Sequence, residues 1–236
     1  MKPARGLLVV ASLGRRENLI SGARRAERLG AGAVEIRIDS LPARDRTRAG
    51  EIFARLKKVC SIPLIATVRS FAEQDPAAKR TRLSEPARLK LYGSVLPFAD
   101  MVDVELDSDR VNRDVVRLAR ESGRTVILSS HDFRSVPGPG SIRRLVKKFR
   151  SLRGDILKVA AAPQDSKSLA EFLLACLRLK DIPRAFIAMG PLGLVSRIGA
   201  GDFGSCLTYG SLKSGYAPGQ VPLQDLIKAI SIFSSL

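Results

Sequence analysis

Residues 125–130, with the sequence TVILSS, form a short run of β-branched and aliphatic side chains that ends at His131. A run that is apolar almost throughout is typical of a β-strand covered on both faces, as in a parallel sheet, because half-exposed strands alternate apolar and polar residues. Residues 155–161, with the sequence DILKVAA, show the same pattern, interrupted by Lys158. The two runs therefore predict buried strands, and each brings an ionisable side chain to the sheet.

Runs of this kind recur along the whole chain of 236 residues. They alternate with segments whose apolar residues recur at helical spacing. The expected strands are residues 7–13, 33–39, 63–69, 101–106, 125–130, 155–161, 185–189 and 205–209. The expected helices are residues 18–29, 47–57, 85–96, 111–121, 141–152 and 166–179, and a last helix beginning at Leu223. This alternation favours a parallel (β/α)8 TIM barrel over an open doubly wound sheet, which has about five or six strands.

Composition places the chain among compact globular proteins. Hydrophobic residues make up 45%, and no long linker divides the sequence, so residues 1–236 are expected to form a single catalytic domain. No apolar run reaches the roughly 18 to 20 residues of a membrane span and no cleavable signal is recognisable, so a cytoplasmic protein without a membrane partner is expected. The three cysteines are far apart and show no zinc or disulfide spacing.

The formal net charge of +17 raises the question of nucleic-acid binding. The arginines do not cluster, however. Arg24, Arg25 and Arg28 recur at helical spacing beside acidic residues, which is typical of a solvated helix face. Aromatic residues for base stacking are only 5%, with no tryptophan. We therefore expect no nucleic-acid partner, and a charge that favours anionic small substrates.

The active site of a TIM barrel lies at the carboxyl ends of its strands. Charge inside apolar strands is costly unless the charges pair or bind something polar, so either a structural ion-pair layer or a binding site is expected there. Residues two apart on a strand face the same side. Glu35, Arg37 and Asp39 should therefore share one face, as should Asp103 and Glu105. The full set of charged residues in or just after the expected strands is Glu35, Arg37, Asp39, Arg69, Asp103, Glu105, His131 and Lys158.

Lys158 and His131 together point to imine chemistry. A lysine in an apolar strand can be held partly neutral by desolvation and by nearby arginines, so that it attacks a ketone and forms a Schiff base. The protonated imine acidifies the adjacent carbon, which a base such as His131 can deprotonate. An acidic residue near the histidine would hold its ring in position, and arginines would bind a substrate carboxylate.

At this point the sequence resembles the type I 3-dehydroquinate dehydratase family, Schiff-base enzymes of the shikimate pathway of aromatic amino acid (chorismate) biosynthesis. The resemblance covers nearly the whole chain. Its motifs are Glu35-Ile36-Arg37-Ile38-Asp39, Thr67-Val68-Arg69-Ser70 with Glu73, Ser129-Ser130-His131-Asp132-Phe133, Leu157-Lys158-Val159-Ala160, Met189-Gly190 with Ser196-Arg197, and Ala217-Pro218-Gly219-Gln220. Each motif alone is a weak signal, whereas all of them in this order are a strong one.

The resemblance implies conversion of 3-dehydroquinate to 3-dehydroshikimate and water, without a metal or a cofactor. Lys158 is similar to the family's imine-forming lysine, His131 to the general acid/base, and Glu73 to the acid that positions this histidine. The implied substrate ligands are Glu35 and Arg37 for hydroxyls, Arg69 as a further polar contact, and Arg197 with Gln220 for the carboxylate.

One position departs from the family pattern. Many members carry a serine directly before the Ala-Pro-Gly-Gln sequence, where this chain has Tyr216. Tyr216 can bond to the substrate from farther away, or Ser214 can substitute if the loop shifts. The sequence leaves both possibilities open.

Two other functions are weighed against this one. A class I aldolase would use the same imine chemistry but would need a phosphate site, for which glycines within residues 199–204 can in principle provide backbone donors. A basic, RNA-associated scaffold is the non-enzymatic alternative and predicts little dependence on Lys158. The resemblance and the apolar residues 227–236 also predict a homodimer.

Overall fold

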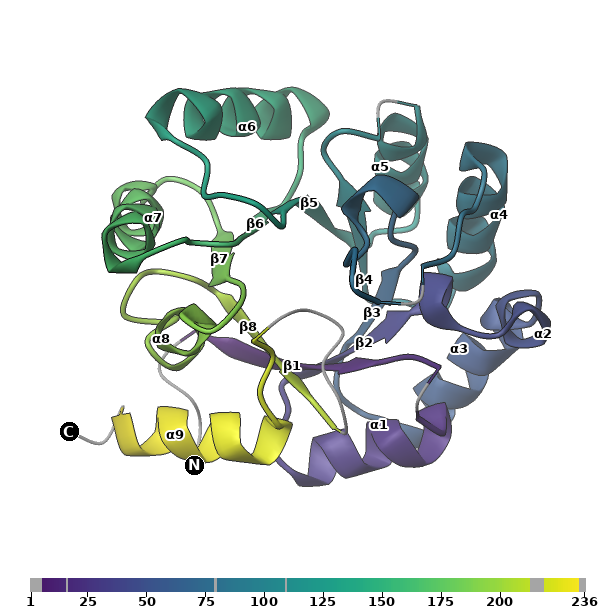
Figure 1. Ribbon diagram of the computed structural model, residues 1–236. Helices are drawn as coiled ribbons and strands as arrows, with labels where there is room; N and C mark the ends of the chain where they lie inside the picture. Colours follow the sequence, from purple (N-terminus) through teal and green to yellow (C-terminus); the bar gives the residue numbers. More distant parts are fainter. Residues whose placement is uncertain (1–5, 16, 79, 109, 213–218, 234–236) are drawn as a thin grey trace.

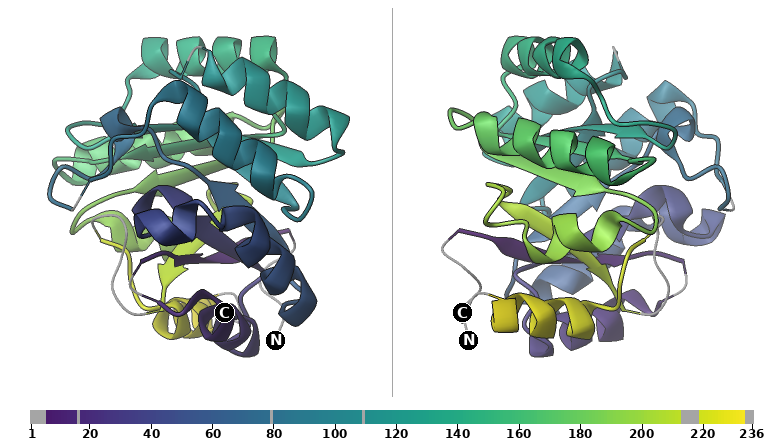
Figure 2. Two further views of the ribbon diagram at one scale, coloured as in Figure 1. Left: turned by 90° about the vertical axis from the view of Figure 1, so that its right-hand side faces the viewer. Right: turned by 60° about the vertical axis from the view of Figure 1, so that its left-hand side comes forward.

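The structure, a computed structural model, describes residues 6–15, 17–78, 80–108, 110–212 and 219–233. Eight parallel strands in the order β7-β6-β5-β4-β3-β2-β1-β8 curl into a near-closed barrel with helices around it (Figure 1). Side views show these helices lying against the outside of the strands (Figure 2). The predicted TIM barrel is confirmed.

The elements follow the predicted alternation. The strands are β1 (Leu8–Leu13), β2 (Ala33–Arg37), β3 (Leu64–Thr67), β4 (Met101–Glu105), β5 (Thr125–Asp132), β6 (Ile156–Ala161), β7 (Arg184–Ala188) and β8 (Leu207–Ser211). The helices are α1 (Leu19–Arg28), α2 (Ala43–Arg46), α3 (Ala49–Val59), α4 (Glu85–Val95), α5 (Val111–Glu121), α6 (Pro139–Leu152), α7 (Ser166–Arg178), α8 (Gly193–Ile198) and α9 (Leu223–Phe233). The sequence did not predict α2 and α8, because helices this short show no readable period.

Two strands end two residues earlier than the sequence predicted. After β2 the chain turns into the 3-10 helix Ile38–Ser40, because the Asp39 carboxylate turns back onto the Arg37 guanidinium at 2.9 and 3.1 Å. Asp39 is therefore not a strand residue. β3 ends at Thr67, so Arg69 lies beyond the strand rather than at its end. Both breaks carry charged side chains into the loops at the barrel mouth.

β5 runs on where the sequence predicted its end. We expected His131 to follow the strand, because the apolar run stops at Ser130. His131 and Asp132 instead continue the parallel pairing with Ala160 and Ala161 of β6. The ladder of backbone hydrogen bonds, rather than the polarity of the side chains, decides where this strand stops, and it fixes the backbone of His131 beside β6.

Side-chain caps begin several of the helices. Asn18 accepts a hydrogen bond from the Ser21 N–H at the start of α1, and Ser84 accepts one from the Ala87 N–H at the start of α4. α7 begins with a reciprocal capping box between Asp165 and Ser168. These caps satisfy N–H groups that have no partner within the helix, which is why each helix starts at these residues.

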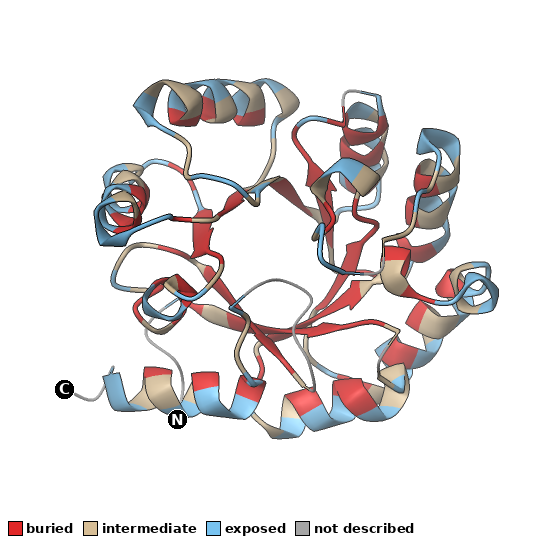
Figure 3. Cartoon of the chain, in the orientation of Figure 1, coloured by how far each residue is buried: buried red, intermediate tan, exposed pale blue. Residues whose placement is uncertain are grey.

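The buried residues lie between the strands and the inward faces of the helices (Figure 3). A smaller apolar cluster fills the inside of the barrel and includes Val10, Ala33, Ile65 and Ile127. Two residues further along the same strands stand Ser12, Glu35, Thr67 and Ser129, which are also buried. Because inward-facing positions recur every two residues, the barrel interior changes from an apolar layer to a polar layer towards the carboxyl ends of the strands.

The barrel closes between β7 and β8 without a regular ladder among the described residues. The Cys206 N–H donates to the Arg184 carbonyl at 2.7 Å, and the Phe186 N–H donates to the Ser205 hydroxyl at 3.0 Å. Of the two buried cysteines, Cys176 contacts this same hydroxyl at 3.5 Å. Within the ranges given above, no helix has both the length and the apolar composition needed to cross a membrane.

Tyr92 of α4 offers a test of how the outer helices hold the barrel. Its buried hydroxyl accepts a hydrogen bond from the Val68 N–H (3.1 Å) and donates one to the Asp103 carbonyl (2.6 Å). Tyr92→Phe leaves both backbone groups without this partner, so we expect the free energy of unfolding, measured in urea, to fall by about 1–3 kcal/mol. The control Arg117→Ala breaks only exposed ion pairs and should change it by less than about 1 kcal/mol. Equal stability of Tyr92→Phe and the unsubstituted protein would contradict this role.

Candidate active site

The predicted site residues that lie within the described ranges line one pocket at the carboxyl ends of the strands. They are Glu35, Arg37, Arg69, Glu73, His131, Lys158, Arg197 and Gln220. The pocket is small, with a volume of about 50 Å³. Tyr216 and its alternative Ser214 lie outside the described residues. The structure therefore brings together residues that lie between positions 35 and 220 of the sequence.

Lys158 of β6 stands in the polar layer of the barrel and is 4% exposed. Its Nζ donates to Asp103 Oδ2 at 2.8 Å and lies 3.8 Å from Glu35 Oε1. The Tyr209 ring covers it, with the ring centre 4.1 Å from Nζ. The sequence predicted that nearby arginines would help to hold this lysine partly neutral. The charged groups that Nζ contacts are carboxylates instead, so the ammonium must give up a proton before it can act as a nucleophile.

Arg69 connects the carboxylates of β4. Its Nη2 donates to Asp103 Oδ1 at 3.0 Å, and its Nη1 donates to Glu105 Oε1 at 3.0 Å and to the Ser129 hydroxyl at 2.7 Å. Glu105 also pairs with Arg88 of α4. Asp103 and Glu105 thus share one face, as predicted. This part of the site is the structural ion-pair layer that the sequence analysis weighed as an alternative to a binding site.

The electrostatic effect of this layer is clearest at Asp103. Burial alone would raise the pKa of its carboxyl, but the neighbouring cations Arg69 and Lys158 lower it well below its ordinary value. Asp103 therefore remains an anion beside Lys158 at neutral pH. Sequence reasoning placed Asp103 and Glu105 on one face of their strand but gave Asp103 no role.

Glu35 and Arg37 of β2 differ in their hydrogen-bond partners and in their exposure. The Glu35 carboxylate accepts hydrogen bonds from the hydroxyls of Ser12 (2.7 Å) and Thr67 (2.9 Å), so both of its oxygens already have partners. Arg37 forms a two-point ion pair with Asp39, and its side chain is 13% exposed. Ser12, Thr67 and Ser129 were missed from the sequence, because hydroxyl residues are ordinary strand formers and carry no signal of their own.

His131 is held by Glu73, which stands in the 3-10 helix Phe71–Glu73 after β3. Glu73 Oε2 accepts a hydrogen bond from the His131 backbone N–H at 2.9 Å and lies 2.8 Å from Nδ1 of the ring. Because Oε2 already accepts from the backbone N–H and an oxygen can accept from two N–H groups at once, we assign the proton of a neutral ring to Nδ1 on this hydrogen-bond pattern. Nε2 is then left without a proton and can act as a base.

Burial disfavours charge on both members of this pair. It raises the pKa of Glu73 to about 8, with a further contribution from the Glu105 carboxylate. For His131, burial and the cations Arg69 and Lys158 lower the pKa well below its ordinary value. The imidazole is therefore neutral at pH 7, which is the state that a general base requires.

Arg197 of α8 is a buried cation that lacks a carboxylate partner in the described part of the chain. Its side chain is among the most completely buried of the protein, at 1% exposure. Nη1 donates to the Ala188 and Gly193 carbonyls, while Nε has no hydrogen-bond partner there. Burial lowers the pKa of Arg197 to about 10, so it stays charged at pH 7. Gly193 is required for this packing, because a Cβ there would lie 2.6 Å from Nη1.

Gln220 is placed by the glycine before it. Gly219 has φ +72°, and a Cβ on it would lie 2.1 Å from the Gly190 carbonyl oxygen, so only glycine fits the close approach of these two loops. Gln220 Nε2 donates to the Gly210 carbonyl at 3.1 Å. The side of the pocket that faces Arg197 and Gln220 is otherwise apolar, with Ile187 and Met189 of the β7 region.

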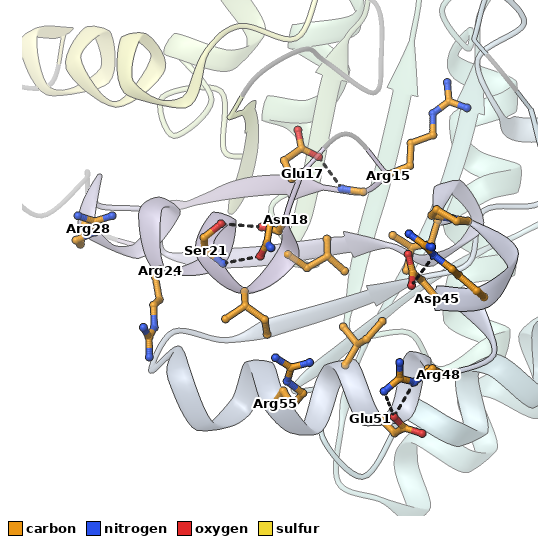
Figure 4. A pocket seen from close by; sticks show the side chains of 17 residues that line it. Arg15, Glu17, Asn18, Ser21, Arg24, Arg28, Asp45, Arg48, Glu51 and Arg55 are labelled. Atoms are coloured by element: carbon orange, nitrogen blue, oxygen red, sulfur yellow. Dashed lines mark hydrogen bonds and ion pairs between the residues drawn. The ribbon is translucent and has the colours of Figure 1, made fainter.

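A wider hollow of about 800 Å³ lies between α1, α2 and α3 (Figure 4). Arginines and a few carboxylates line it, and Arg48 pairs with Glu51 at 2.8 Å with both side chains 63% exposed. Arg24 and Arg28 are exposed as well, as the sequence predicted for a solvated helix face. Size alone does not mark a site of chemistry, and Glu73, Asp103 and His131, whose pKa values are strongly shifted, lie at the barrel mouth rather than in this hollow.

Comparison with known proteins agrees with this geometry. A family profile described as type I 3-dehydroquinase matches residues 9–236. The chain belongs to this family. The 3-dehydroquinate dehydratase of Methanococcoides burtonii is 33% identical over 204 residues, 86% of this chain and 85% of that protein. The 3-dehydroquinate dehydratase of Aquifex aeolicus is 30% identical over 213 residues, 89% and 92% of the two chains. The crystal structure of 3-dehydroquinate dehydratase from Geobacillus kaustophilus has a TM-score of 0.88 at 25% identity, covering 100% of this chain and 96% of that one.

As a type I 3-dehydroquinase the chain is a hydro-lyase of the shikimate pathway, and the resemblance drawn from the sequence motifs is confirmed. Neither the class I aldolase nor the RNA-associated scaffold is the family that these comparisons show. The roles of the individual residues are inferred from the geometry of the pocket.

For this type I 3-dehydroquinase the state of His131 can be measured directly, because the chain has one histidine. The lowered pKa means that the ring stays neutral as the pH falls through about 6.5 and takes up a proton only at lower pH. We expect the imidazole NMR resonances of the folded protein to show this low midpoint, and those of the urea-unfolded protein to titrate near 6.5. In Glu73→Gln the midpoint should stay low, since burial and the two cations set it. A midpoint at or above 6.5 in the folded protein would contradict a buried neutral base.

Proposed function

We propose that this type I 3-dehydroquinase converts 3-dehydroquinate to 3-dehydroshikimate and water through a Schiff base on Lys158, with His131 as the general acid/base. One observation supports this most. Lys158 and His131, from the adjacent strands β6 and β5, line a single buried pocket, and the ring of His131 is oriented by Glu73. We therefore propose Glu73 as the residue that positions the histidine.

The proposed reaction starts when Nζ of Lys158, after losing a proton, attacks the ketone carbon C3. The C–N bond forms, the ketone oxygen leaves as water, and an iminium ion results. The iminium withdraws electrons from C2, so that Nε2 of His131 can take the C2 proton. The electron pair left on C2 then expels the C1 hydroxyl, which receives this proton from His131 and leaves as water. Hydrolysis of the imine returns the lysine.

Asp103 has a part in this scheme that follows from its charge. The iminium has the same positive charge as the ammonium and stands on the same nitrogen, whose distance to Asp103 Oδ2 is 2.8 Å. The buried region therefore carries no additional charge when the imine forms. A buried charge without its counter-ion would cost several kcal/mol, on the order of 3–5.

We propose that Arg197 binds the substrate carboxylate. It is a buried cation whose Nε lacks a partner in the described ranges, and an anion with two oxygens can satisfy a guanidinium at two points. We propose that Gln220 assists it from the neighbouring loop. Any contribution of Tyr216 remains a prediction, because that residue lies outside the described ranges.

The three remaining substrate ligands differ in what they can offer. Arg37 is the most exposed of them, and we propose that it contacts the substrate hydroxyls. Glu35 has both oxygens occupied by Ser12 and Thr67, so it is proposed to contact a hydroxyl only with its remaining lone pairs. Arg69 donates to three side chains of the protein, and we propose that its positive charge acts mainly through Asp103 and His131.

We also propose that the chain forms a homodimer. Large apolar side chains are exposed on three consecutive helices of one side of the barrel, α7, α8 and α9 (Figure 1). They are Leu174, Leu177, Leu194, Val195, Ile232 and Phe233. Such side chains support a contact with a second copy of the chain.

The imine can be trapped. Incubation with 3-dehydroquinate and borohydride should reduce the imine to a stable amine, and mass spectrometry of the digested protein should place the adduct on Lys158. The exposed Lys57 serves as the internal control and should remain unmodified. A protein that turns over substrate but carries no adduct on Lys158 would rule out the proposed mechanism.

The same assay separates the role of the histidine. His131→Ala keeps Lys158 and its carboxylate partners, so the fold should be unchanged by circular dichroism while turnover falls by about 100-fold or more. Near-normal turnover in this variant would show that another group moves the C2 proton.

Arg197 is tested by removing its charge. Arg197→Met keeps an unbranched apolar stem in the place of the arginine stem, and we expect kcat/KM for 3-dehydroquinate to fall by about 100-fold because a buried charge-assisted contact with the carboxylate is lost. Arg55→Met removes an equal charge from the open hollow between the helices and should leave kcat/KM nearly unchanged. Equal kcat/KM in both variants would place the carboxylate elsewhere.

A further inference from the structure

Tyr209 of β8 has a buried hydroxyl that the reaction scheme above does not use. The residue is 5% exposed and lines the same pocket as Lys158 and His131. Its hydroxyl oxygen is buried and has no hydrogen-bond partner within the described ranges. Buried polar groups of folded proteins nearly always have a partner, and an exception inside a ligand pocket points to a group that the ligand satisfies.

This hydroxyl keeps its proton at neutral pH and can therefore donate a hydrogen bond. Burial raises the pKa of Tyr209 well above its ordinary value, and the carboxylates of Glu35 and Asp103 raise it further. Each carboxylate is already bonded, Glu35 by Ser12 and Thr67 and Asp103 by Arg69, Ser129 and Lys158.

Among the residues that the structure describes, two buried donors in the pocket thus lack an acceptor, the Nε–H of Arg197 and the O–H of Tyr209. A carboxylate accounts for the first. The second needs another oxygen, and that oxygen must be close to Lys158, because the Tyr209 ring centre lies only 4.1 Å from Nζ. The substrate carbon that bonds to Nζ has to enter beside this ring, and it carries its ketone oxygen with it.

We propose that the Tyr209 hydroxyl donates a hydrogen bond to the ketone oxygen of the carbon that Lys158 attacks. This inference rests on the imine mechanism proposed above. When the Nζ electron pair forms the C–N bond, the π pair of the C=O bond moves onto the oxygen. The Tyr209 O–H stabilises the negative charge that develops there, without transferring its own proton. The oxygen then takes two protons, one from Nζ after its attack and the one that the ammonium lost before it, and leaves as water as the nitrogen electron pair forms the C=N bond.

The ring and the hydroxyl of Tyr209 then have separate functions. The ring face attracts the positive charge on Nζ, both as ammonium and as iminium. The hydroxyl acts only in the steps that form or hydrolyse the carbinolamine, because only these steps place charge on the ketone oxygen. Tyr209→Phe removes the second function and keeps the first.

The test measures how fast the imine forms. Unsubstituted protein and Tyr209→Phe are mixed with 3-dehydroquinate, quenched with borohydride after increasing times, and the Lys158 adduct is quantified by mass spectrometry. We expect the adduct to form about 100-fold more slowly in Tyr209→Phe, the effect of removing one donor to a developing oxyanion. The thermal unfolding midpoint without ligand should not fall, because the hydroxyl that is removed has no partner in the described protein.

Tyr92→Phe is the matched control, since it also removes a buried tyrosine hydroxyl but one that bonds to the backbone outside the pocket. It should lower the unfolding midpoint and leave the rate of adduct formation unchanged. Equal rates in Tyr209→Phe and the unsubstituted protein would overturn the role of Tyr209 alone. A slower rate accompanied by a lowered unfolding midpoint would overturn it in favour of a structural role. If the unsubstituted protein forms no adduct, the imine mechanism fails and the role of Tyr209 fails with it.

Discussion

The pairing of Lys158 with Asp103 inside the barrel is the interaction on which the rest of the site depends. Lys158 is only 4% exposed, and its ammonium is stable there only if charges and hydrogen bonds replace the water it has lost. Asp103 supplies the nearest charge, and Arg69 keeps Asp103 ionised and fixed. The positive and negative charges of the ion-paired side chains around this pair are equal in number. The cations are Arg37, Arg69, Arg88 and Lys158, and the carboxylates are Glu35, Asp39, Asp103 and Glu105.

This balance explains why the pocket has two different sides. The charged side comes from β2 to β5 and their loops, where each charge has a partner within the protein. The other side, from β6 to the loop after β8, is apolar apart from Lys158, Gln220 and two buried donors, Arg197 and Tyr209, that lack acceptors in the described ranges. The paired groups use their charges and hydrogen bonds within the protein and so hold the site in place. The unpaired donors are the groups whose hydrogen bonds a ligand can accept. Between the two sides, His131 remains a neutral base because burial and the nearby cations disfavour its charged form.

Much of this could be predicted from the sequence. Strands buried on both faces read as continuous apolar runs, so the alternation of strand and helix predicted the barrel, and the charges interrupting those runs predicted its mouth. His131 and Lys158 were found because an ionisable group in an apolar run is rare. Strand ends were predicted less well. The run that stops at Ser130 does not end β5, and Asp39 and Arg69 lie beyond their strands, because backbone pairing and local side-chain contacts set those ends.

The sequence by itself determined the fold and the inventory of reactive groups, because both depend on local patterns of polarity that each strand carries along its own length. Only the tertiary structure decided which groups are paired and which are not. Ser12, Arg88 and Tyr209 look ordinary in their own segments, and they gain their roles from neighbours that come from distant strands and helices. Pairing is a property of distances between elements, and it is the closure of the barrel that sets these distances.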